Sequence, residues 1–373
     1  MNGIVVGALV ALSMAQQKTD TVFPVQDAKT LEVSTDGGSI VVTAWDRNEV
    51  RVQADHSLRT IVSIRRRHGG ERIDVEAEAR RGPGGIVDYQ ISVPRTLALE
   101  LNGMYTDISV TGVEAAVSAE TMQGDVTVKG GRGSVKASTT TGKLLVEGAQ
   151  GKVDASTAAG EIRFVNVTGD ITAESAGGDI LFENAKATSV DAGTTGGRIR
   201  YDGTLGKTGT YLFGSYGGPV TLVLPEGTAA SMTLSTIHGT VLNNMSGQME
   251  RLRGGERHQV TLGGGGAVVE VETFGGRIAV LKKGTEDTVG QAGGSWNSGE
   301  WGDVGPWAAD VAVDVAIDHA SRWADIGAEL GRQIGRDFKA GTMPRERWER
   351  RLHPDTVPPD TVSATIHPSP SSI

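Results

Sequence analysis

An 18-residue repeat organises the middle of this chain. Short apolar segments recur at that spacing, at positions 108–110, 126–128, 144–146, 162–164 and 180–182, and once more after 19 residues at 199–201. A second series lies between them, at 117–119, 135–137, 153–155, 171–173 and 190–192. From its second member on, each segment of the first series begins two residues after a glycine. Self-similarity at such a period is typical of stacked repeat folds.

Each repeat holds two segments that can form short β-strands. Because successive side chains of a strand point to opposite faces, alternate residues share one face. The first series then turns larger residues inward, Val128, Val146, Phe164, Phe182 and Tyr201, and the second turns small ones inward, Ala119, Ala137, Ala155, Ala173 and Ala192. We predict an all-β fold: a single-stranded β-solenoid (β-helix) of 18-residue coils over residues 99–283, entered from an N-terminal β-strand region over 16–98.

The N-terminus has the pattern of an export signal. Residues 1–15 combine a short apolar run with small residues at a cleavage site, which predicts a signal peptide; a buried strand is the alternative. No later segment approaches the ~20 apolar residues of a transmembrane helix. We therefore expect an exported protein without a transmembrane segment, located in the periplasm, at the cell surface or outside the cell. The chain has no cysteine, which excludes disulfides and thiolate metal sites.

The C-terminal quarter has a different composition. Residues 284–306 form a predicted linker rich in glycine and tryptophan, and residues 307–340 carry apolar residues three to four apart, which predicts an amphipathic helix. Aspartates lie in its first half and basic residues close it, matching the helix dipole. Residues 311–317 fit a strand equally well. Residues 341–373 are first basic and then rich in Pro and Ser, which predicts a disordered tail.

The repeated units resemble a known bacterial family. Segments of the form Gly-x-[Val/Ile]-x-apolar, preceded by VPRTL at 93–97 and ended by GGRIAV at 275–280, are similar to the putative adhesin family, a domain of unknown function built from β-strand repeats. The resemblance covers about residues 28–283. It implies an envelope-associated or secreted β-solenoid, and it brings no catalytic motif.

Candidate contact residues lie on the outward positions of the repeat. Leu145, Arg163, Leu181, Arg198 and Arg200 alternate with the core residues, and the outward leucines indicate that a partner covers this face. A solvated sheet with charge pairs between coils is the alternative. The densest aromatic cluster of the chain consists of Trp296, Trp301 and Trp307. It is a second candidate for contact with an envelope glycan or protein. The alternative is that these side chains hold the linker and the helix against the repeat. The formal charge of −9 argues against nucleic-acid binding.

No pattern for catalysis, metal or cofactor binding stands out. The seven histidines lack zinc-ligand spacing, and neither a calcium-binding nonapeptide nor a nucleophile elbow occurs. An enzyme acting on polysaccharides would depend on Asp154, Asp170, Glu174 and Asp191. We predict instead a non-enzymatic structural or adhesive module of the bacterial envelope, with that enzyme and a self-assembling envelope scaffold as alternatives.

Overall fold

The computed structural model describes residues 16–79, 85–252 and 256–285. All of them belong to one compact unit, which lies within Met1–Gly327. The predicted signal peptide, the linker beyond residue 285, the amphipathic helix over 307–340 and the tail over 341–373 lie outside the described residues. These predictions are therefore untested.

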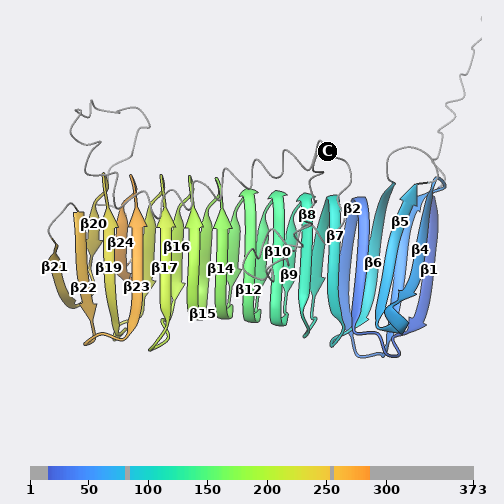
Figure 1. Ribbon diagram of the computed structural model, residues 1–373, viewed down its shortest axis with the longest axis horizontal. Helices are drawn as coiled ribbons and strands as arrows, with labels where there is room; N and C mark the ends of the chain where they lie inside the picture. The colour runs from blue at the N-terminus through green and yellow to red at the C-terminus, as the bar shows by residue number, and fades with distance from the viewer. Residues whose placement is uncertain (1–15, 80–84, 253–255, 286–373) are drawn as a thin grey trace, which may run out of the picture. The chain divides into compact units, whose positions relative to one another are not determined.

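The described residues form an all-β fold, as the repeat predicts, with one short 3₁₀ turn (Figure 1). The N-terminal elements are β1 (Gln16–Pro24), β2 (Thr30–Trp45), β3 (Glu49–Ser57), β4 (Thr60–Arg67), η1 (His68–Gly70), β5 (Arg72–Ala79), β6 (Ile86–Pro94) and β7 (Ala98–Thr111). The elements of the repeat region are β8 (Val117–Gln123), β9 (Val126–Lys129), β10 (Arg132–Thr141), β11 (Leu144–Glu147), β12 (Gln150–Ala159), β13 (Ile162–Val165), β14 (Thr168–Ser175), β15 (Ile180–Thr194), β16 (Ile199–Gly203), β17 (Thr210–Ser215) and β18 (Val220–Leu224). The final elements are β19 (Ala230–Thr236), β20 (Val241–Asn243), β21 (Gly247–Arg251), β22 (Glu256–Leu262), β23 (Ala267–Thr273) and β24 (Ile278–Lys282).

The periodic strands form two parallel rows. In the short-strand row, β9, β11, β13, the start of β15, β16 and β18 pair in that order. In the long-strand row, β8, β10, β12, β14, the end of β15 and β17 do the same. Register follows the sequence period, so that Val126 pairs with Leu144 and Leu144 with Ile162. Because β2, β7 and β15 contribute to both rows, all strands belong to one hydrogen-bonded sheet.

The core lies between the two rows. In the short-strand row the larger residues of the repeat are buried, and the rings of Phe164 and Phe182 stack with centroids 4.8 Å apart. Tyr201 continues this series, with its ring centroid 5.5 Å from that of Phe182. The alanines of the long-strand row are buried opposite them. Small side chains in one row therefore leave room for aromatic rings in the other, as the alternation predicts.

A buried hydroxyl marks the corner between the rows. It belongs to a Thr or Ser that stands three residues before a glycine: Thr121, Thr139, Thr157, Ser175, Thr194, Ser215, Thr236 and Thr273. Ser215 shows the arrangement, because its Oγ donates to the Gly197 carbonyl at 2.9 Å and accepts the Gly218 N–H at 2.9 Å. At every one of these positions except Thr157, whose hydroxyl has no hydrogen-bond partner among the described residues, the hydroxyl thus satisfies backbone groups where the chain turns away from the strand.

The corner glycines stack directly on one another. A Cβ built on Gly142 would lie 2.0 Å from the Gly124 carbonyl oxygen, and one on Gly160 would lie 1.8 Å from that of Gly142. The same close approach continues through Gly178 and Gly197, at 1.6 and 2.0 Å. The glycine that precedes each strand of the first series is therefore required by the backbone of the neighbouring coil, and not only by its own turn.

Both ends of the stack depart from sequence order. At the C-terminal end, β23 lies between β17 and β19, and β24 lies between β18 and β20 (Figure 1). After β18 the chain thus skips one place in each row and forms β19 and β20. It then returns, and β23 and β24 occupy the skipped places. At the N-terminal end, β2 lies between β7 on one side and β5 and β6 on the other.

Antiparallel strands cover the outermost coils. β22 pairs antiparallel with β19 and β21 with β22, while β4 pairs with β5, β3 with β6 and β1 with β3. The exposed ends of a stacked sheet would otherwise offer unpaired backbone to other chains. The reversed strands therefore act as caps, and β4 carries three consecutive arginines at its end.

Candidate functional site

The outward side of the short-strand row carries a continuous ladder of leucine and arginine. Leu145 pairs in register with Arg163, Arg163 with Leu181, and Leu181 with Arg200. Neighbouring members are therefore separated by one strand spacing of ~4.8 Å. Arg163 is exposed and the other three are half-buried. We call these four residues the Leu–Arg ladder; the structure brings together four of the five outward residues that the sequence singled out.

The charges of the ladder are unequally compensated. Arg163 forms an ion pair with Glu183. Within the described residues, no carboxylate forms an ion pair with Arg200. Arg198 belongs to the adjacent outward row, where its Nε lies 2.8 Å from Asp179 Oδ2. Within the part of the chain that the structure describes, the ladder therefore combines apolar surface with one guanidinium, that of Arg200, which pairs with no carboxylate.

The tryptophan cluster cannot be placed beside the ladder. Trp296, Trp301 and Trp307 lie outside the described residues. Their predicted role in partner contact is untested.

The four acidic residues of the enzyme hypothesis lie on three neighbouring outward rows of the long strands. Asp154 and Asp191 share the middle row, separated by Thr172, Glu174 lies in the row on one side, and Asp170 lies in the row on the other side. Asp170 accepts hydrogen bonds from Thr188 Oγ1 at 2.5 Å and Ser189 Oγ at 2.8 Å. These bonds lower the pKa of the Asp170 carboxyl below its usual value.

Glu174 has the opposite electrostatic environment. Burial raises the pKa of its carboxyl, and the negative charges of Asp191 and Asp154 raise it further. Both effects disfavour the ionised form. Asp154 is partly neutralised by Lys152, whose Nζ lies 3.2 Å from Asp154 Oδ2. Glu174 therefore holds its proton more readily than an ordinary glutamate does.

We expect Glu174→Gln to stabilise the protein at about pH 8 and to have little effect at about pH 3.5. A raised pKa in the folded state means that the folded protein binds the Glu174 proton more tightly than the unfolded chain does. The folded state of the unmodified protein therefore becomes less stable as the pH rises through that pKa. Glutamine removes this dependence because it cannot ionise. Thermal unfolding midpoints of both proteins at the two pH values test this. An equal difference at both values would contradict it.

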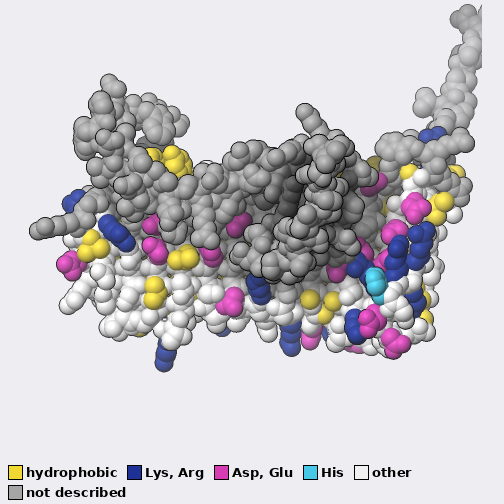
Figure 2. Space-filling view, viewed as in Figure 1, with side chains coloured by type: hydrophobic (Ala, Val, Ile, Leu, Met, Phe, Trp, Pro, Cys, Tyr) yellow, Lys and Arg dark blue, Asp and Glu magenta, His cyan; other side chains and the backbone are white. Residues whose placement is uncertain are grey.

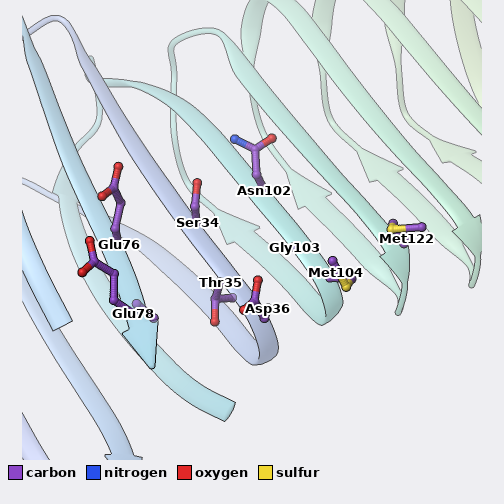
Figure 3. A pocket seen from close by; sticks show the side chains of 10 residues that line it. Ser34, Thr35, Asp36, Glu76, Glu78, Asn102, Gly103, Met104 and Met122 are labelled. Carbon is purple, nitrogen blue, oxygen red and sulfur yellow. The ribbon is translucent and has the colours of Figure 1, made fainter. Parts of the chain in front are cut away.

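A shallow cavity of about 380 Å³ lies near the N-terminal end (Figure 3). Glu76 and Glu78 line one side, and Met104 and Met122 line the other. Arg65 lies 3.5 Å from both glutamates and Arg67 lies 3.5 Å from Glu76, so arginines offset part of their negative charge. The cavity offers no enclosed apolar space for a ligand.

Charges of both signs are interspersed at this end of the stack (Figure 2). Arg72 pairs with Glu32, and also with Asp74 and Glu100 at 3.1 Å each. Asp74 is buried and is also paired with Arg67, at 2.5 Å. This network joins β4, β5, β2 and β7, near the place where β5 pairs with β2. We interpret it as structural.

Among the described residues, no cluster of His, Asp and Glu side chains is arranged to hold a metal ion. Over the same ranges, no helix is long and apolar enough to cross a membrane.

No family model matches the chain. No curated protein matches it either. Among solved structures, a putative adhesin from Bacteroides fragilis is 12% identical, with a TM-score of 0.39 over 72% of this chain and 99% of that chain. A putative lipid binding protein from Parabacteroides distasonis is 11% identical, with a TM-score of 0.39 over 71% and 96%. A putative cell adhesion protein from Clostridium sporogenes is 9% identical, with a TM-score of 0.21 over 72% and 100%. Likenesses of this size assign neither a family nor a function.

One surface cluster was missed by the sequence analysis. Tyr216 and Phe274 lie at the corner between the rows, and their rings stack with centroids 4.7 Å apart and planes 7° apart. Each occupies the same place in a Ser/Thr-aromatic-Gly-Gly sequence, at 215–218 and 273–276. That shared motif is the signal that could have paired them.

Proposed function

We propose that the described strands form a β-solenoid, a single chain wound into coils of two parallel strands each. Three observations support this: in-register parallel pairing between residues 18 apart, two rows that enclose one core, and glycines stacked from coil to coil. Stacked repeats of this kind bury a continuous core and leave extended outer faces for binding.

We further propose that the protein is a non-enzymatic, exported binding module of the bacterial envelope. Residues 1–15 supply the predicted export signal, and the Leu–Arg ladder supplies the binding surface. Its pattern fits an envelope surface that offers both apolar and anionic groups, such as acidic polysaccharide or lipid headgroups. The observation that carries this proposal is the pairing of the half-buried outward Leu181 with Arg200, which has no carboxylate partner among the described residues.

Replacing Leu181 by Asp is expected to weaken binding to anionic envelope material by about tenfold, or ~1.4 kcal/mol. The new carboxylate would lie between Arg163 and Arg200 in the register and would neutralise them, while the apolar contact is lost. Co-sedimentation with an acidic polysaccharide measures the loss of binding to polysaccharide. Co-sedimentation with vesicles of neutral lipid, and with vesicles that also contain anionic lipid, measures the loss of binding to lipid headgroups. Together they show which of the two the ladder binds.

Thr168→Asp is the matched control, because it adds the same charge beside Lys186 on the long-strand row. Binding of this variant should match that of the unmodified protein. If both variants bind as the unmodified protein does, or if none of these surfaces is bound, the role of the ladder is wrong. Equal unfolding midpoints would show that the two substitutions leave the fold intact.

A polysaccharide-acting enzyme is the second candidate. It is favoured by the raised pKa of Glu174, since a general acid must hold a proton near its working pH, and by the further carboxyl groups on the same face. Against it, the Asp170 carboxyl already accepts hydrogen bonds from Thr188 and Ser189. Release of reducing ends from acidic or neutral polysaccharides would favour the enzyme.

End-to-end assembly into a scaffold is the third candidate. The antiparallel strands at both ends argue against this assembly, because reversed and charged edge strands discourage pairing between sheets. Open parallel ends would favour it. Sedimentation velocity at rising concentration distinguishes a monomer from a polymer.

A further inference from the structure

The aromatic corner, which we define as Tyr216, Phe274 and His238, is an exposed ring cluster at the turn between the two rows. Phe274 stacks on Tyr216, and the His238 ring meets Phe274 edge-on, with centroids 5.2 Å apart and planes 79° apart. Tyr216 is 51% exposed, and the neighbouring Ile237 is 38% exposed. Contiguous exposed apolar groups on a soluble protein mark interaction sites more often than isolated ones do.

Backbone hydrogen bonds place these rings in three successive coils. The Gly275 N–H donates to the Tyr216 carbonyl at 3.1 Å, and the His238 N–H donates to the Phe274 carbonyl at 2.8 Å. On the other side of Tyr216, the Gly217 N–H donates to the Thr195 carbonyl at 2.9 Å. Phe274 therefore covers one face of the Tyr216 ring, and the opposite face is on the side of the Thr195 coil.

The coils on that side carry only small residues at the corner. The positions equivalent to Tyr216 are occupied by Thr195, Ala176 and Ala158. The adjacent Gly177 and Gly196 have open space or ordinary contacts where a Cβ would lie. Since each coil occupies ~4.8 Å along the stack, a flat ring placed against Tyr216 would extend over one to two of these coils. Among the described residues, no bulky side chain at the corner therefore blocks the free face of Tyr216.

Polar groups accompany the ring on the neighbouring outward row. Two residues before the corner, this row reads Ser156, Glu174, Gly193, Gly214 and Glu272 in register. Gly193 and Gly214 add no side chain beside Thr195 and Tyr216, and Glu174 stands next to Gly193 in this row. A ligand stacked on Tyr216 that reaches this row would therefore meet a carboxyl group rather than further apolar surface.

We propose that the aromatic corner binds a pyranose unit of a saccharide. One face of a pyranose ring presents C–H groups, which pack on the negative face of an aromatic ring, and its rim presents hydroxyls, which donate to carboxylates and hydroxyl oxygens. Tyr216 supplies the stacking face, Phe274 holds its ring in place, and Glu174 and Thr195 supply polar partners. An apolar or aromatic peptide segment fits this setting less well, because only one face of one ring is free and the surroundings are polar.

This site is separate from the Leu–Arg ladder, which lies outward on the short-strand row. Binding at the aromatic corner does not depend on the ladder. Loss of saccharide binding in Tyr216 variants and loss of envelope binding in Leu181→Asp are therefore independent results.

The test uses the full chain on an array of neutral and acidic oligosaccharides, followed by calorimetric titration of the tightest-binding oligosaccharide. Tyr216→Ala should weaken that binding by at least about tenfold, which corresponds to ~1.4 kcal/mol. Tyr216→Phe keeps the stacking face and should bind within about threefold of the unmodified protein, which corresponds to under ~1 kcal/mol. Tyr105→Ala is the matched control, because Tyr105 is 54% exposed and lies in β7. Its binding should be unchanged.

Three results would overturn the site. The first is that the full chain binds no oligosaccharide, and the second is equal binding by the unmodified protein and Tyr216→Ala. The third is an equal loss in Tyr105→Ala and Tyr216→Ala, because the effect would then not be local. Cleavage of the bound oligosaccharide would support the site and would contradict the non-enzymatic function proposed above.

Discussion

Replacing Gly178 by Ala is expected to destabilise the protein by about 3 kcal/mol or more, or to prevent folding. A Cβ at this position would lie 1.6 Å from the Gly160 carbonyl oxygen and 2.5 Å from its carbonyl carbon. Both atoms belong to the backbone of the preceding coil, so no side-chain rotation can relieve the contact. The two coils would have to separate, which breaks the parallel hydrogen bonds between β13 and β15.

Gly177→Ala is the matched control at the adjacent residue. Its nearest heavy atom would be the Ala158 carbonyl oxygen at 3.7 Å, an ordinary contact. We expect a change within about 0.5 kcal/mol, as for most surface substitutions. Denaturant unfolding of the three proteins measures both effects. Similar losses in the two variants would show that the stacked glycines are not required for close approach between coils.

Ending the chain after Leu262 is expected to unfold the C-terminal end of the stack. This truncation removes β23 and β24, which lie between β17 and β19 and between β18 and β20. β24 is the strand with which β20 pairs, and β19 would keep only β22. The buried Val269, Val271 and Val280 would be lost with them, and each buried aliphatic side chain contributes roughly 1.5–3 kcal/mol.

Hydrogen exchange resolved by segment tests this expectation. Residues 230–251 should lose protection in the shortened chain, whereas β8 to β14 should keep it, because their pairing partners are intact. A chain ending after Thr285 is the control, since it retains every described strand. Protection of β19 and β20 in both truncated chains would contradict the returning arrangement.

The sequence predicts the periodic part of the fold well because one physical rule determines it there. Alternation assigns Phe164 and Phe182 to the core, and the 18-residue spacing sets which residues pair. The spatial order at the two ends could not be predicted. Gly239 and Gly276 precede strands with the same signature, which indicates a place within a coil but not which coil lies next to it. The order follows from contacts, since Gly276 lies against Gly218 and Gly239 lies against Gly276.

The same limit explains the candidate surfaces. Leu145 and Leu181 could be assigned outward from parity alone, and their register with Arg163 followed from the period. The aromatic corner could not be found in this way, because Tyr216 and Phe274 become neighbours only when β23 returns beside β17. The compensation of Arg163 and Arg198 by different carboxylates also depends on side-chain geometry that no spacing reveals.

The returning strands fix the length of both ends of the stack, whereas the middle of the repeat can vary in length. Between β8 and β14 every coil meets its neighbours through the same register, the same buried hydroxyl and the same corner glycine. A tandem duplication of 18 residues in this stretch would therefore add one coil, ~4.8 Å of length and a complete set of partners. An insertion of another size would keep the corner glycines stacked only if the extra residues bulge out of the coil, as they do where Gly178 and Gly197 are 19 residues apart. Related proteins of different length should accordingly differ by whole coils in the middle of the repeat, while the capped ends keep the same number of strands.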